Sequence, residues 1–63
     1  MIFKIKEARE ELNISQEKLA RKANVSRAII SGLETGAISV TSTKTLSKIA
    51  DALGKKVSDI FLE

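Results

Sequence analysis

The stretch SQEKLARKANVSRAIISGLETG, residues 15–36, decides the fold of this 63-residue chain. Ser15 has a short hydroxyl side chain that favours the start of a helix. Asn24 tolerates the left-handed backbone conformation, so that helix is expected to end there in a sharp turn. Ser26 can begin the next helix, which should run to about residue 34 before the stop signal of Gly36. The stretch therefore predicts two short helices joined by a tight turn of three residues.

The small and apolar positions of this stretch favour close packing of the two helices. Ala20 is small enough to let them approach, and Val25 can fill the corner between them. Ile30 and Leu33 lie three residues apart and can hold the second helix on the first. A turn this short between closely packed helices is what a helix-turn-helix motif needs.

The residues before this stretch also show the periodicity of a helix. Ile5, Ala8 and Leu12 recur at spacings of three and four, which predicts an amphipathic helix that buries all three. The segment 37–41, after the stretch, is expected to be a loop or an extended segment without an evident partner strand.

The rest of the chain is predicted to be helical as well. Ser42 or Thr43 can begin a helix that ends at Gly54, and a short final helical turn would bury Val57, Ile60 and Phe61. We therefore expect an all-α fold, a compact bundle of about five short helices. It would form one domain over residues 1–63, with the helix-turn-helix core at about 16–36. The initial Met and the fit to one domain favour a complete protein.

Composition excludes several classes of function. The chain has no Cys and no His, which removes thiolate nucleophiles, zinc-finger ligand sets and the commonest general base. We expect no enzyme activity and no cofactor. No apolar run approaches a membrane span, so we expect a cytoplasmic protein. The net charge of +3 and pI near 9.5 permit a polyanionic partner.

Three groups of residues together resemble the Cro/C1-type helix-turn-helix family, which includes lambdoid phage repressors, Cro proteins, small bacterial regulators and antitoxins. They are Ser15 to Ala20, Asn24 to Arg27, and Ile30 to Gly36. The segment LSKIADALG, residues 46–54, resembles the fourth helix of that family. The resemblance covers nearly the whole chain and implies binding to double-stranded DNA.

The resemblance also implies which residues would read bases. The groove-facing positions of its recognition helix correspond to Arg27, Ala28, Ser31 and Gly32. Arg27 can bind guanine O6 and N7 in a bidentate pair or hold a phosphate, and both readings stay open. Ile29 and Gly32 depart from the polar residues usual in the family. Ile29 either packs on a thymine methyl group or a sugar, or extends the core edge, and Gly32 can permit close approach to the DNA.

Further roles follow from the resemblance. Residues at the starts of helices would contact phosphates, namely Gln16, Ser26, Ser42, Thr43 and Lys44. A partly buried salt bridge between Arg9 and Glu34 would hold the first helix over the recognition helix.

A homodimer is expected, because one module of this kind reads only a few base pairs. The apolar residues that could form its interface are Ala37, Ile38, Val40, Phe61 and Leu62. The leading hypothesis is a repressor that binds a palindromic operator, with no small-molecule effector. The alternative is an antitoxin that binds a toxin protein and represses its own operon.

Overall fold

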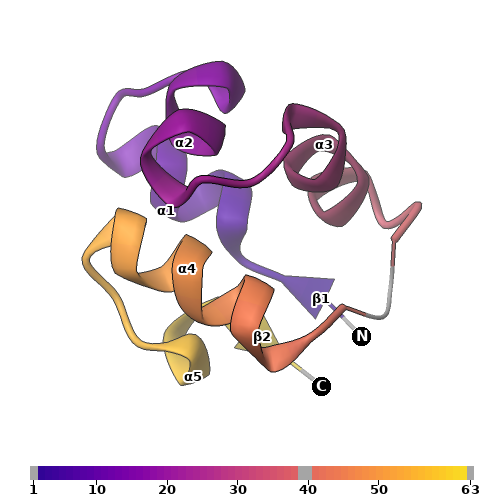
Figure 1. Ribbon diagram of the computed structural model, residues 1–63. Coiled ribbons are helices and arrows are strands. Elements are labelled where there is room, and N and C mark those ends of the chain that lie inside the picture. Colours follow the sequence, from indigo (N-terminus) through magenta and orange to yellow (C-terminus); the bar gives the residue numbers. More distant parts are fainter. Residues whose placement is uncertain (1, 39–40, 63) are drawn as a thin grey trace.

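The computed structural model describes residues 2–38 and 41–62, and Figure 1 shows their arrangement. Within these ranges the chain forms five short helices and two very short strands, which confirms the predicted all-α bundle. The elements in chain order are β1 (Ile2–Phe3), α1 (Ile5–Glu11), α2 (Gln16–Ala23), α3 (Arg27–Thr35), α4 (Thr43–Leu53), α5 (Val57–Ile60) and β2 (Phe61–Leu62).

Serine caps begin three of these helices. The side chains of Ser15, Ser26 and Ser42 accept hydrogen bonds from the backbone amides of Lys18, Ile29 and Thr45, respectively. Each cap satisfies an amide that has no partner within its own helix. The structure thus confirms the helix starts expected at Ser15 and Ser26. Of the two candidates for the start of α4, Ser42 is the N-cap and Thr43 is the first helical residue.

Left-handed residues end the same three helices. Asn24 has φ 57° and ψ 45° after α2, and Gly36 has φ 86° after α3. Gly54, with φ 68°, ends α4 as the sequence predicts. These sharp ends keep the connections short, so that consecutive helices pack on one another.

The core is aliphatic and is shared by all the helices. Among the described residues, each helix contributes one side chain with no exposed surface, and these are Ile5, Leu19, Ile30, Ile49 and Ile60. Helix α2 packs against both α3 and α4, while α1 packs against α3. The core therefore fixes α3 from two sides.

The first helix is shorter than its periodicity predicts. It ends at Glu11, and Leu12 is 45% exposed instead of buried, so that prediction was wrong. Leu12 is the C-cap of α1, and Asn13, with φ 60°, turns the chain directly after it. Phe3, from β1, is buried in the core and is only 7% exposed.

The strands β1 and β2 were not expected from the sequence. They pair antiparallel, with Ile2 opposite Leu62 and Phe3 opposite Phe61, beside the two ends of the chain in Figure 1. Phe61 therefore belongs to a strand and not to the final helical turn. Two-residue strands are too short for an alternating pattern to be detected.

Candidate nucleic-acid interface

Helices α2 and α3 form the predicted helix-turn-helix. The turn between them is closed by the Val25 amide, which donates to the Ala20 carbonyl oxygen at 3.0 Å. Ala20 and Ala23 are 5% and 4% exposed, and their small side chains let the neighbouring helices approach α2 closely. Figure 1 shows the tight connection from α2 into α3. Steric demand at each of these positions sets the angle at which α3 leaves the turn.

The first turn of α3 is open to solvent. Arg27 and Ala28 are exposed, Ile29 and Ser31 are half-buried, and Ile30 and Leu33 face the core. Within residues 2–38 and 41–62, the Arg27 guanidinium has neither a salt bridge nor a hydrogen bond. An unpaired guanidinium beside the capped start of a helix is suited to bind either a phosphate or a guanine edge.

Gly32 is placed differently from the expected open, base-reading position. It is buried, and the Ile38 side chain lies over it. A Cβ at position 32 would stand 2.6 Å from Ile38 Cγ1, which is closer than real contacts allow. The Gly32 backbone therefore meets Ile38 of the same chain, and a role of Gly32 toward a base stays a prediction. The signal in the sequence was a mid-helix glycine followed by an apolar residue just past the helix end.

The expected phosphate-binding residues stand at the starts of α2, α3 and α4. Gln16 is half-buried, and its Nε2 donates to Glu34 Oε1 at 3.0 Å, a structural role that the sequence reasoning missed. Ser26 remains exposed while its oxygen caps α3. Ser42 is more fully engaged, since its hydroxyl also donates to Thr45 Oγ1 at 2.9 Å. Thr43 and Lys44 are exposed in the first turn of α4, so they are the better placed residues of that helix.

Arg9 and Glu34 form the ion pair that the family resemblance implied. Arg9 Nε lies 2.8 Å from Glu34 Oε2, and Nη2 lies 3.1 Å from Oε1, a bidentate geometry. Nη1 also donates to the Ile14 carbonyl oxygen at 2.8 Å. The two side chains are only 13% and 3% exposed. One guanidinium thus joins α1, the α1–α2 connection and the last turn of α3.

The contact with Glu34 changes the pKa of Arg9. The hydrogen bond to Glu34 raises the pKa of the Arg9 guanidinium above its ordinary value, and partial burial opposes the rise. Arg9 therefore stays charged wherever the protein is folded, and the pair acts as a fixed structural link.

Charge is unevenly distributed along the chain. Residues 13–54, which span α2, α3 and α4, contain six basic and three acidic side chains. The remaining residues contain five of each sign. The whole net charge of +3 therefore belongs to the segment that carries the helix-turn-helix, as binding to a polyanion requires.

The proposed dimer-interface residues do not form one described patch. Ala37 is exposed, whereas Ile38 is half-buried and packs on the core beside α3. Val40 lies outside the described residues, as do the side chains of Phe61 and Leu62. The structure therefore packs the half-buried Ile38 against α3 of its own chain.

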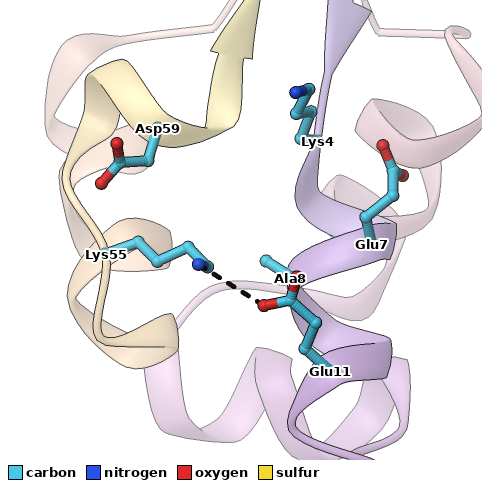
Figure 2. Close-up of a pocket in the computed structure, with 6 residues that line it drawn as sticks. All are labelled: Lys4, Glu7, Ala8, Glu11, Lys55 and Asp59. Atoms are coloured by element: carbon cyan, nitrogen blue, oxygen red, sulfur yellow. Dashed lines mark ion pairs between the residues drawn. The ribbon is translucent and has the colours of Figure 1, made fainter.

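A groove lies between α1 and α5 among the described residues (Figure 2). Side chains of both signs line it, and Lys55 Nζ lies 3.5 Å from Glu11 Oε1 across the gap. Its lining consists of Lys4, Glu7, Ala8, Glu11, Lys55 and Asp59. This mixture favours neither a polyanion nor a polycation.

The described residues contain neither a metal-ligand group nor a membrane-spanning helix. No group of side chains there could hold a metal ion. No helix there is long and apolar enough to cross a membrane.

Comparison with known proteins agrees with this geometry. An uncharacterized HTH-type transcriptional regulator of Archaeoglobus fulgidus is 41% identical over 62 residues, which cover 98% of this chain and 86% of the relative. One from Methanothermobacter thermautotrophicus is 42% identical over 59 residues, covering 92% of this chain and 84% of the relative. The helix-turn-helix family matches residues 5–60. The chain therefore belongs to the Cro/C1-type helix-turn-helix family of DNA-binding transcriptional regulators.

Proposed function

We propose that this protein is a cytoplasmic, sequence-specific reader of double-stranded DNA and that it represses transcription. The observation that carries the proposal is the first turn of α3, where Arg27 is exposed and unpaired within the described residues. The turn is held rigidly, because Ser26 caps it and Ile30 and Leu33 anchor the helix in the core. A helix whose backbone is already ordered can enter the major groove, so that the ordering cost is confined to side chains such as Arg27.

The contacts indicate which residues of this interface would bind a base and which would bind phosphates. Arg27 would bind guanine O6 and N7, which distinguishes that base by about 1–3 kcal/mol. The exposed Thr43 and Lys44, together with Gln16, would bind phosphates and set the register of α3. The second hydrogen of Gln16 Nε2 is the group we assign to a phosphate, since one hydrogen is bound to Glu34.

Two copies would bind one palindromic operator, with their α3 helices one turn of DNA apart. Repression would then result from steric exclusion of RNA polymerase. The exposed Ala37 is the best residue for testing the interface, because the half-buried Ile38 also supports the fold. Ala37→Glu should give a folded monomer by light scattering and weaken operator binding. A dimer of unchanged stability would contradict this interface.

The test of the function is selection of sites from random duplex DNA at near-physiological salt. We expect an enriched inverted repeat, and we expect Arg27→Gln to relax the preference at one position per half-site. Lys56→Gln is the matched control, because Lys56 is an exposed cation before α5. It should leave the selected sequence unchanged. Failure to enrich any sequence would refute the proposal and favour binding to a toxin protein instead.

A further inference from the structure

The contact between Gly32 and Ile38 changes what the recognition helix presents at its middle turn. Gly32 has no side chain of its own, and Ile38 occupies the space into which a side chain at position 32 would project. Ile38 Cβ, Cγ1 and Cδ1 all lie within contact distance of that space. The loop after α3 thus supplies a side chain that the helix itself lacks.

Hydrogen bonds hold Ile38 in this place. Its amide donates to the Gly32 carbonyl oxygen at 2.9 Å. Thr35 Oγ1 donates to the same oxygen at 3.4 Å and accepts from the Ala37 amide at 3.4 Å. Because a β-branched side chain has few rotamers, a fixed Ile38 backbone also restricts the direction of the side chain. The apolar surface over Gly32 is therefore preorganised.

Ile38 also lies next to the exposed part of α3. Positions 28 and 32 are one helical turn apart on the same face of α3, so the space over Gly32 that Ile38 fills adjoins the face that carries Ala28. Ala28 is exposed and Ile38 is only half-buried, so both residues keep solvent-accessible surface. Arg27 adjoins this strip in the same turn.

We propose that Ile38 is a specificity-determining residue that contacts the 5-methyl group of a thymine, in place of a side chain at position 32. The proposal rests on the proposed function, since it requires α3 in the major groove. The thymine methyl is the apolar feature of that groove, and a preorganised aliphatic side chain is its natural partner. The net positive charge of residues 13–54 favours DNA over an apolar protein surface as the occupant of this face.

The experiment replaces each thymine of the selected duplex in turn by deoxyuridine, which removes the methyl group and keeps base pairing. Burial of one methyl group corresponds to a loss of about four-fold in affinity. We expect that loss at one thymine per half-site. In Ile38→Ala the overall affinity should fall, and deoxyuridine at that thymine should cause no further loss.

Two controls separate base contact from a purely structural effect. Val57→Ala also shortens a half-buried aliphatic side chain on the core, but on α5, so its deoxyuridine penalty should match the wild type. Ile38→Val keeps the branched Cβ, so it serves if Ile38→Ala does not fold, and its penalty should shrink.

The outcomes distinguish this inference from the proposed function. If the wild type selects an operator but no thymine is sensitive to loss of its methyl group, Ile38 does not read the DNA. A penalty that persists unchanged in Ile38→Ala and Ile38→Val would likewise overturn the inference. Failure of the wild type to bind any selected duplex would refute the proposed function, and the inference with it.

Discussion

Removal of one partner of the Arg9–Glu34 pair should destabilise the protein more than removal of both. In Arg9→Met, the Glu34 carboxylate keeps only the hydrogen bond from Gln16, although its side chain is 3% exposed. In Glu34→Leu, the Arg9 guanidinium keeps the hydrogen bond to the Ile14 carbonyl oxygen as its one hydrogen bond within residues 2–38 and 41–62. In the double variant no charge is left buried, and an apolar pair of similar size fills the space.

The expected loss of unfolding free energy in each variant follows from how deeply the remaining charge is buried. An unpaired charge in a buried site destabilises by about 3–5 kcal/mol, and the retained Gln16 bond places Arg9→Met at about 3 kcal/mol. Arg9 is 13% exposed and can partly reach water, so Glu34→Leu should lose about 2–3 kcal/mol. The double variant leaves the Ile14 carbonyl oxygen without its donor and should lose about 1–2 kcal/mol. A chain of this length has a total free energy of unfolding of about 3–9 kcal/mol, so these differences are large.

Urea unfolding followed by far-ultraviolet circular dichroism measures all four proteins. We expect the loss in the double variant to be at least about 2 kcal/mol smaller than the sum of the single losses. Additive losses would refute the reasoning, because they would mean that the two charges do not depend on each other for their burial.

Three further predictions concern stability. Gly32→Ala should lower the free energy of unfolding by about 1–2 kcal/mol, because overpacking against Ile38 outweighs the better helix propensity of Ala. In the Ile38→Ala background the same substitution should raise the free energy of unfolding by up to about 1 kcal/mol, because the overpacking is removed. Thermal melts of the four proteins measure this reversal, and a gain in both backgrounds would contradict it. Ser26→Ala should lose about 1 kcal/mol of unfolding free energy in urea through the lost cap, and no loss would refute the role of the cap. The raised pKa of Arg9 keeps its stabilisation fully present below the pKa of the unfolded chain, with loss only as the pH rises through the folded-state pKa. The difference in unfolding free energy between wild type and the double variant should therefore stay constant from about pH 7 to pH 9, and a fall across that range would count against the pairing.

The helix-turn-helix could be predicted from the sequence because each of its positions meets a local demand. Ser15 and Ser26 satisfy free amides, Asn24 takes the left-handed conformation, and Ala20 admits a neighbouring helix. These requirements act within a few residues, so a single sequence is enough to reveal them. The start of α4 at Ser42 was fixed to within one residue for the same reason.

The features that were missed depend on contacts between distant residues. Periodicity predicted Leu12 in the core, but α1 ends at Glu11 and Leu12 is exposed, whereas Phe3 from β1 is buried. Gly32 was expected to face DNA from its place in the predicted recognition helix, whereas its contact with Ile38 depends on the path of the loop after α3. Gln16 binds Glu34 across eighteen positions, a separation over which a pattern in one sequence gives no signal.

The most direct test of the central claim is the titration of isotope-labelled protein with the selected duplex, followed by the backbone amide signals in nuclear magnetic resonance spectra. We expect the large shifts at the starts of α2, α3 and α4, at Gln16, Arg27, Ala28 and Lys44. The groove between α1 and α5, with Glu7 and Asp59, should be unaffected (Figure 2). Shifts centred on that groove, with α3 unchanged, would contradict the claim that α3 reads the DNA.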